Sequence, residues 1–272
     1  MIRKLTASDR AAAVTLLTRA PHLNLYMLGN LETLGFEREF CEFWGDVSAT
    51  GAQNSLRAIL NRYMTGWTIY GQPDAAWSAL GAVLDQHPAG ATRLQDNPGG
   101  IISFLPYLQR YQSGEVKIEE VMNLQAGDFR PIHAPDQAVI RRATLDDLPR
   151  LVEFYADAGD MRRDAAAIER PLRDTRLWLA ETGQTVVATA LTNAESSTLA
   201  MIGGVYTTPT QRGQGFSQAV CSALCAELLA DGKQPVLYWI TPAAGAVYRK
   251  LGFRACGQWR SVWLRGSAYQ TK

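Results

Sequence analysis

The chain has 272 residues, 47% of them hydrophobic, and its formal net charge at pH 7 is only +1. This length allows one large or two small domains, and the hydrophobic content is enough for a packed core. The small net charge gives no case for nucleic acid or an anionic membrane as a partner, and no apolar run approaches the ~20 residues of a membrane span. Since the first residues also lack the pattern of a signal peptide, we expect a soluble, cytoplasmic protein.

The first half is expected to alternate strands with helices. Residues 1–5 predict a short edge strand, and Thr6 to Asp9 can cap a helix over 11–19. A second helix is expected at 24–34 from the spacing of its leucines. Further strands are expected at 40–47, 56–64, 67–70 and 116–124, with a helix at 75–84 between the last two. The run 101–111 fits either strand or helix, because it is short and contains Pro106.

The second half repeats this order of elements after a segment, residues 126–137, whose glycine and prolines predict a linker. Thr144 can cap a helix that runs to Tyr155, and the charged residues 157–176 predict a loop and a second helix. The strands expected here are 138–142, a hairpin of 177–181 and 185–193, a central strand 198–207, a buried parallel strand 236–240, and a final strand 259–265.

The most informative stretch follows the central strand. It reads Arg212-Gly213-Gln214-Gly215-Phe216-Ser217 and then becomes a helix that Gly232 ends. Glycines let a ligand approach the backbone closely, and the first N–H groups of the helix are free to bind an anion. A strand, a glycine loop and a helix start therefore predict an anion site.

Three familiar versions of such a loop do not fit. A P-loop needs a Gly-Lys-Ser/Thr ending, and no lysine stands here. The dinucleotide-binding fingerprint needs a third glycine, where this chain has Gln218. A hydrolase elbow at Ser217 needs a histidine later in the chain, whereas the three histidines all lie before it, at positions 22, 87 and 133.

The loop resembles the pyrophosphate loop of the GNAT (Gcn5-related) N-acetyltransferases, Gln/Arg-x-x-Gly-x-Gly/Ala. Arg212, Gly215 and Ser217 occupy its specified positions, with Ser217 replacing Gly or Ala. A second match follows at residues 241–253, TPAAGAVYRKLGF, which is similar to the family's Asn-Pro-x-Ser-Asn-x-x-Tyr-x-x-Leu/Ile-Gly-Phe helix. The two motifs together identify residues 138–272 as a GNAT-like domain.

The resemblance implies an α/β fold with a mixed central sheet flanked by helices. Because the first half echoes the element order without the glycine loop, we expect two tandem GNAT-like domains: a degenerate copy at 1–125, the linker, and a catalytic domain at 138–272. The degenerate copy would either shape the substrate cleft or give structural support, and the sequence does not choose between them. The family's helix pair borders the acceptor, which at 157–176 makes Asp157, Asp160, Arg162 and Arg163 candidates for substrate contact, although charged residues are usually solvated.

The implied reaction is acyl transfer from acetyl-CoA to a primary amine of a small molecule or peptide. Backbone from Gly213 to Ser217, including Gln214 and Phe216, would bind the pyrophosphate, and Arg212 would pair with a phosphate. By resemblance, two neighbouring strands splay apart to hold the pantetheine arm, and the backbone of Val205, Tyr206 and Thr207 would stabilise the developing oxyanion. Tyr248 is the predicted general acid toward the departing thiolate. No general base can be named, because Glu181 and Glu195 also fit surface positions.

The motif departs from the family pattern in ways that leave a second function open. Thr241 replaces the family's asparagine, and Ala244-Gly245 replaces its Ser-Asn pair, which removes an amide that contacts the cofactor. A non-catalytic module that binds or senses acyl-CoA, with a structural first half, is therefore the alternative. The resemblance is compatible with a homodimer.

The remaining distinctive residues are given structural interpretations. Cys221 and Cys225 lie one helical turn apart, but no further ligands complete a metal site, so all four cysteines are expected to be free thiols and no metal is expected. The aromatic residues of the first half are interpreted as core rather than as a ligand platform; they are Trp44, Tyr63, Trp67, Tyr70 and Trp77.

Overall fold

The computed structural model describes residues 1–48 and 55–266. These residues form two compact units. Unit 1 contains residues 1–48 and 55–120 together with 257–266, and unit 2 contains Val121–Cys256. This division differs from the domain boundaries expected from the sequence, because residues 121–137 pack with the second half and the chain from 257 packs with the first.

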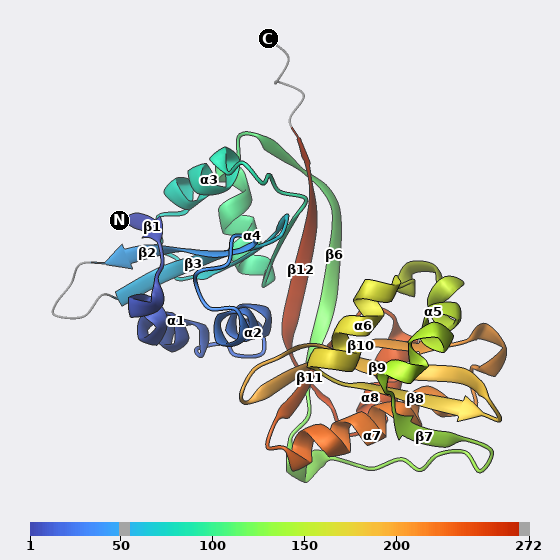
Figure 1. Cartoon of the computed structure of the whole chain (residues 1–272). Coiled ribbons are helices and arrows are strands. Elements are labelled where there is room, and N and C mark those ends of the chain that lie inside the picture. Colours follow the sequence, from blue (N-terminus) through green and yellow to red (C-terminus); the bar gives the residue numbers. More distant parts are fainter. Residues whose placement is uncertain (49–54, 267–272) are drawn as a thin grey trace. The chain divides into compact units, whose positions relative to one another are not determined.

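Each half of the chain builds the same order of elements (Figure 1). The first repeat consists of β1 (Ile2–Lys4), α1 (Arg10–Leu17), α2 (Leu25–Thr33), β2 (Cys41–Ser48), β3 (Ser55–Tyr63), β4 (Gly66–Gly71), α3 (Trp77–Gln86), β5 (Arg93–Asp96), α4 (Pro98–Phe104) and β6 (Tyr111–Asn123). The second consists of β7 (Val139–Arg142), α5 (Leu148–Ala156), α6 (Ala165–Asp174), β8 (Leu177–Thr182), β9 (Thr185–Glu195), β10 (Leu199–Thr207), α7 (Phe216–Ala230), β11 (Gln234–Trp239), α8 (Pro242–Lys250) and β12 (Arg254–Gly266). The strand–helix–helix–strands–helix–strand order expected from the sequence is thus found twice.

The two repeats also share a residue pattern that the sequence analysis missed. Residues 2–9 and 140–147 both read Ile-Arg-Lys/Arg-x-Thr-x-x-Asp. In each, the threonine and aspartate form a capping box, and the arginine binds that aspartate with two bonds of 2.7 and 2.8 Å. A bidentate arginine–carboxylate pair fixes geometry as well as charge, so the same device joins the first strand to the first helix in both repeats.

The structure decides one open element of the first half and adds one that was not expected. The run beginning at Ile101 belongs to a helix, α4, and ends in a short 3-10 turn at Leu105–Tyr107 before β6 begins at Tyr111. Strand β5 was not predicted, since Arg93–Asp96 contains a single apolar residue, Leu94, and gives no periodic signal. Hydrogen bonding to β4 and β12 stabilises this strand, although its own residues have little strand propensity.

In unit 1 the strand order is β1-β2-β3-β4-β5-β12-β6. The first four strands are antiparallel, β5 runs parallel to β4, and β12 runs antiparallel to β5. The last strand of the second repeat therefore completes the sheet of the first unit. Of the aromatic residues expected in the core, Trp67 and Trp77 are buried, and Trp44 and Tyr70 pack against buried clusters. The prediction is wrong for Tyr63, whose side chain is 43% exposed.

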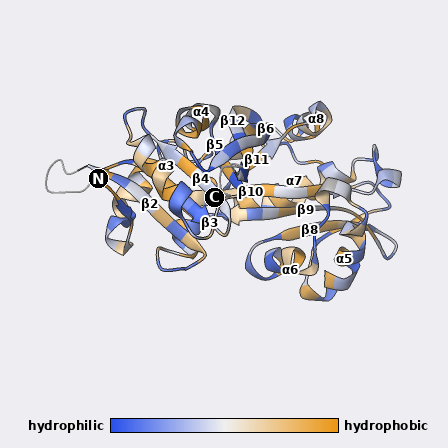
Figure 2. Cartoon of the chain, turned by 90° about the horizontal axis from the view of Figure 1, so that it is seen from above, coloured by the Kyte–Doolittle hydropathy of each residue, from blue (hydrophilic) through white to orange (hydrophobic). Residues whose placement is uncertain are grey.

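In unit 2 the strand order is β11-β10-β9-β8-β7, and the end of β6 adjoins β11, where the Leu124 N–H bonds the Pro235 carbonyl. Helices α5 and α6 lie on one face of this sheet and α7 on the other (Figure 2). The two faces have separate cores, one built on Tyr155 and Tyr206 and one on α7 and Leu237. The expected linker is part of this unit: Phe129 and Ile132 pack on the α7 core, and Ser222 Oγ accepts from the Ile132 N–H at 2.9 Å.

The repeated arginine–aspartate pair predicts a pH-dependent stability. The Arg141 guanidinium lowers the pKa of Asp147 to about 2 from 3.8. A carboxyl group with a lowered pKa stabilises the fold above pH ~4. This stabilisation is lost as the pH falls toward ~2. We expect Asp147→Asn to lower the free energy of unfolding by about 1–2 kcal/mol at pH 7, measured by urea denaturation, with the difference from wild type shrinking as the pH falls from 5 to 3. A difference that stays constant over this range would contradict the assignment.

Candidate active site

The site begins where two parallel strands of unit 2 part. Strand β10 pairs with β11 from Leu199 to Ile202, opposite Gln234 to Leu237, and the pairing ends there although both strands continue. On its other edge β10 stays paired with β9 as far as Thr207. The edge of β10 that faces β11 is therefore open from Gly203 onward, as the resemblance predicts for a cleft between splayed strands.

A β-bulge in β10 turns one peptide unit toward this opening. The register with β9 skips from Gly203 to Tyr206, so neither Gly204 nor Val205 has a partner residue there. Gly204 has φ +57, and a Cβ on it would lie 2.7 Å from the Leu191 side chain, which makes glycine necessary. Bulge and glycine together rotate the backbone out of the regular ladder.

The direction of this peptide follows from its hydrogen bonds. The Gly204 carbonyl accepts from the Tyr155 hydroxyl at 3.0 Å and from Thr189 Oγ1 at 3.1 Å. Thr189 belongs to β9, so the carbonyl points toward the β9 side. In a trans peptide the C=O and the following N–H point in opposite directions. The Val205 N–H consequently points toward the β11 side, into the opening.

The glycine loop stands at the end of this strand. Gly213 and Gly215 have φ +79 and +87, and a Cβ on either would meet no atom within 4 Å, so the space above the loop is open. Gly215 is the N-cap of α7, and the first helical bond is from the Ala219 N–H to the Gly215 carbonyl. Within the described residues, no group accepts from the backbone N–H groups of 213–218. These N–H groups lie at the positive end of a 15-residue helix, the position where the sequence predicts an anion.

Side chains of the loop leave this site accessible. Arg212 is exposed, and its Nε donates to the Thr207 carbonyl at 3.3 Å, while no carboxylate of the described residues pairs with it. Gln214 bonds Gln211 at 3.0 Å, and Phe216 is buried in the core beneath the helix. Ser217 is half-buried in the first turn. The guanidinium of Arg212 is thus available to an anion at the loop.

Tyr248 lies on α8 in the core beside α7. Its side chain is 7% exposed and its ring meets Phe253 edge-on, with centroids 6.0 Å apart. Burial raises the pKa of Tyr248 well above its ordinary value, and the thiols of Cys221 and Cys225 add to the shift. The hydroxyl keeps its proton at any working pH, and it donates to no acceptor in the described part of the chain.

Gly245 stands where the resembled motif has the asparagine of its Ser-Asn pair, and the structure leaves no room for a side chain there. A Cβ on Gly245 would lie 2.8 Å from two carbons of the Trp239 ring, so the indole occupies the space of a side chain there. On the same ring, the Arg249 guanidinium lies 5.4 Å from the centroid. The Trp239 Nε1 is buried and bonds no described residue. Trp239 was not singled out from the sequence, because only the fold brings it against α8.

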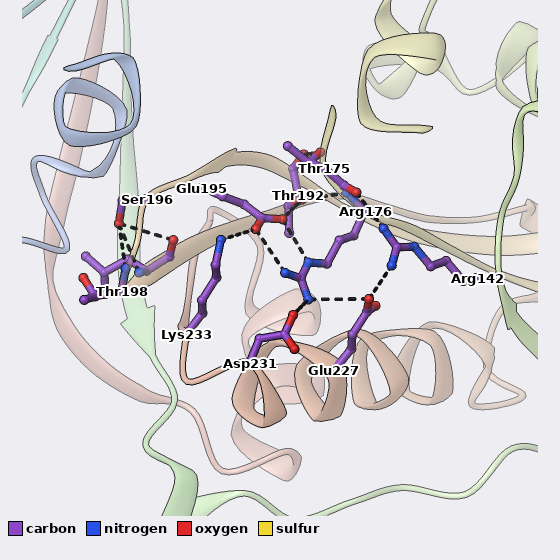
Figure 3. Close-up of polar contacts among 11 residues, drawn as sticks. Arg142, Thr175, Arg176, Thr192, Glu195, Ser196, Thr198, Glu227, Asp231 and Lys233 are labelled. Carbon is purple, nitrogen blue, oxygen red and sulfur yellow. Dashed lines mark hydrogen bonds and ion pairs between the residues drawn. The ribbon is translucent and has the colours of Figure 1, made fainter. Parts of the chain in front are cut away.

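The two glutamates considered as bases are held in ion pairs instead. Glu195 is bound by Arg176 at 3.2 Å and by Lys233 at 2.6 Å, at the start of β10 and away from its bulge (Figure 3). Burial would raise the pKa of Glu195, but the bonds from Lys233 and Thr192 bring it below its ordinary value. Arg141 and Arg150 similarly lower the pKa of Glu181. Neither carboxylate is free to take a proton from a substrate.

The start of α3, the corresponding helix of unit 1, differs from that of α7 in the described residues. The turn after β4 has no glycine loop, and the N–H of Ala76, the N-cap of α3, donates to the buried carboxylate of Asp46 at 2.9 Å. Burial alone would raise the pKa of Asp46, but bonds from Arg57 and Ala76 bring it below its ordinary value. The protein's own negative charge therefore occupies the helix start where a diphosphate would bind.

Among the charged candidates of 157–176, Asp157 and Arg162 are exposed, whereas Arg163 is partly buried; the side chain of Asp160 lies outside the described residues. All four cysteines are free thiols, as expected. The described residues contain no cluster of His, Cys, Asp or Glu suited to a metal ion, and none of their helices has the length and apolar character needed to cross a membrane.

Comparison with known proteins agrees with this geometry. Residues 180–264, less than half of the chain, match the family described as FR47-like protein. No curated protein matches the sequence. Solved structures are similar over nearly the whole chain. A GCN5-related N-acetyltransferase from Sphaerobacter thermophilus shares 17% identity, with 98% of this chain and 95% of that one covered and a TM-score of 0.68.

Two further structures extend this result. A GCN5-related N-acetyltransferase from Kribbella flavida shares 14% identity over 97% of both chains, with a TM-score of 0.62. A tandem GNAT protein from the clavulanic acid biosynthesis pathway shares 12% identity over 100% of this chain and 99% of that one, with a TM-score of 0.65. The resemblance read from the two motifs is thereby confirmed at the level of fold: the chain has the GNAT acetyltransferase fold in a tandem arrangement.

Because Trp239 packs on Gly245, the usual stabilising effect of a glycine-to-alanine change in a helix should be reversed there. Alanine in place of glycine within a helix ordinarily stabilises by about 1 kcal/mol. We expect Gly245→Ala to destabilise by about 1–3 kcal/mol, because its Cβ must displace the indole. Urea denaturation and tryptophan emission would measure the effect. In a Trp239→Leu background the same change should stabilise; a stabilising effect in the wild-type background would contradict the contact.

Proposed function

We propose that the protein is an acyl-CoA-dependent N-acyltransferase that transfers an acyl group, most simply acetyl, from the thioester to a primary amine by direct attack. The observation that carries this proposal is the coincidence, in unit 2, of a free helix N-terminus at Gly215 with an open strand edge at Gly203–Thr207. The first can bind a diphosphate and the second an extended arm. Coenzyme A is an extended molecule that carries both groups.

The residues present fit this co-substrate. Open space over Gly213 and Gly215 allows close approach to the backbone donors from 213 to 217, and Arg212 adds a charge without a competing carboxylate in the described residues. The free edge of β10 offers backbone groups of Val205, Tyr206 and Thr207 to the arm, in the manner of an added strand. When bound, acetyl-CoA would supply the activated acyl group.

The chain's own contribution to the chemistry is positioning and charge stabilisation. The Val205 N–H points into the opening and is fixed by the two hydroxyls that hold the Gly204 carbonyl, so it can meet a developing oxyanion without reorganisation. Tyr248 would hold a proton for the departing thiolate. Its raised pKa weakens it as an acid, which favours donation of a hydrogen bond to the thiolate over complete proton transfer.

One observation favours a second candidate, a module that binds acyl-CoA without turnover. The carboxylates considered as bases, Glu181 and Glu195, are both held in ion pairs. Catalysis would then depend on an amine that arrives unprotonated or on water as the proton acceptor. Release of free thiol from acetyl-CoA in the presence of an amine panel separates the two functions, since the module would bind coenzyme A and release none.

The loop assignment predicts a position-specific loss of coenzyme A affinity. Gly215→Ala imposes a left-handed conformation on a residue with a Cβ, which costs about 1–2 kcal/mol and re-aims the N–H groups that follow. We expect the dissociation constant for coenzyme A, measured by calorimetry, to rise about tenfold or more. Gly232→Ala is the matched control, because Gly232 has φ +71 just beyond the other end of α7. Equal affinity in both variants, or no heat with wild type, would refute the loop site.

The role of Tyr248 predicts a separation of binding from turnover. Tyr248→Phe keeps the packing against Phe253 and removes the hydroxyl. We expect kcat to fall roughly 100-fold while the calorimetric affinity for coenzyme A is unchanged. Tyr107→Phe, at a residue 44% exposed in unit 1, serves as the control. If Tyr248→Phe turns over like wild type, the acid assignment is wrong.

A further inference from the structure

Arg163 is a cation that the described part of the protein leaves without a counter-ion. It precedes α6 and is partly buried, unlike its exposed neighbour Arg162. Its Nη2 donates a long hydrogen bond, 3.3 Å, to Oδ1 of Asn193, and its Nε is buried without a partner. No carboxylate among the described residues lies within ion-pair distance of it. A partly buried charge without a partner costs free energy, and an anionic ligand would offset that cost.

The guanidinium lies beside the bulge of β10. Nη2 is 3.2 Å from the position that a Cβ on Gly204 would take, and the guanidinium carbon is 5.9 Å from the centroid of the Tyr155 ring. Tyr155 in turn bonds the Gly204 carbonyl. Arg163 therefore stands over the peptide whose N–H faces the opening, on the α5–α6 face of the sheet. The glycine loop begins α7, on the opposite face (Figure 2).

We propose that Arg163 binds a carboxylate of the acceptor, so that the amine acylated by this protein belongs to an amino acid or another small amine that carries a carboxylate. This inference rests on the proposed function and names the substrate class of the same site. The glycine loop that would bind acetyl-CoA begins α7, on one face of the sheet. The α5–α6 face is therefore left for the amine substrate. A carboxylate held by the guanidinium would place its amine next to the Gly204–Val205 peptide.

The chemistry of the pocket favours a carboxylate over a phosphate. A guanidinium presents a planar fork that matches the two oxygens of a carboxylate. The printed contacts of Arg163 are with the Asn193 amide, the Tyr155 ring and Gly204, and Arg170 donates to the Asn193 carbonyl at 3.0 Å. Lysine cannot reproduce the fork, so the assignment also distinguishes arginine from a simple positive charge.

The test compares acceptors in matched pairs. Release of free thiol from acetyl-CoA is measured with glycine, L-alanine and β-alanine, each against its amide, for the wild type and for Arg163→Gln, Arg163→Lys and Arg162→Gln. We expect Arg163→Gln to reduce kcat/KM for the carboxylates by about 10- to 100-fold, and for the amides by less than about 2-fold. Arg163→Lys should recover part of the loss, and Arg162→Gln should match wild type. Dividing the carboxylate-to-amide ratio of each variant by that of wild type cancels the intrinsic reactivity of each amine.

Each other outcome overturns a definite statement. If wild type acylates amines but Arg163→Gln lowers carboxylates and amides equally, the carboxylate contact is wrong and the proposed function stands. If O-phosphoethanolamine is preferred to every carboxylate and loses that preference in Arg163→Gln, the ligand is a phosphate. If wild type releases no free thiol from acetyl-CoA with any amine, the proposed function and this inference both fail. Unchanged calorimetric affinity of Arg163→Gln for coenzyme A shows that the variant is folded.

Discussion

The orientation of one peptide, Gly204–Val205, determines what unit 2 can do. Its carbonyl is fixed by two hydroxyls on the β9 side, and its N–H therefore faces the edge where β10 and β11 have separated. The bulge and the positive φ of Gly204 set this orientation of the peptide. The loop that follows is positioned by the same strand, since Arg212, where the glycine loop begins, is five residues after Thr207.

The two repeats differ at the start of the helix that precedes the second strand of their parallel pair. In unit 1 the parallel pair β4 and β5 is in register from Gly66 to Thr68. What differs is the helix start. There Asp46 supplies a buried carboxylate to the Ala76 N–H, whereas the start of α7 keeps its donors free. One aspartate on a neighbouring strand thus satisfies the helix internally, and the first repeat keeps the fold without the anion site.

The parts of this arrangement that sequence predicted are those specified locally. Helix caps, apolar periodicity, and the glycines of the loop act over a few residues, so most elements and the turn that leads into α7 were predicted in place. The parts it did not predict depend on distant partners. Trp239 against Gly245, Arg163 over Gly204, the short strand β5, and the placement of β12 in the first unit all require the folded chain. The Ile-Arg-x-x-Thr-x-x-Asp repeat was readable but was missed, because the two halves were compared by element order rather than by residue.

The charged residues of unit 2 explain why Arg163 stands apart. Arg176 is 9% exposed, and it is surrounded by Glu195, Glu227 and Asp231 (Figure 3). Arg141 likewise binds two carboxylates. The fold therefore supplies partners to arginines whose role is structural. Arg163 receives a side-chain amide at 3.3 Å and an aromatic ring, both of which orient a guanidinium without neutralising it. An oriented charge beside the Gly204–Val205 peptide, with no counter-ion among the described residues, is better explained by a ligand than by stability, since replacing it with an apolar side chain would relieve the cost of burying it.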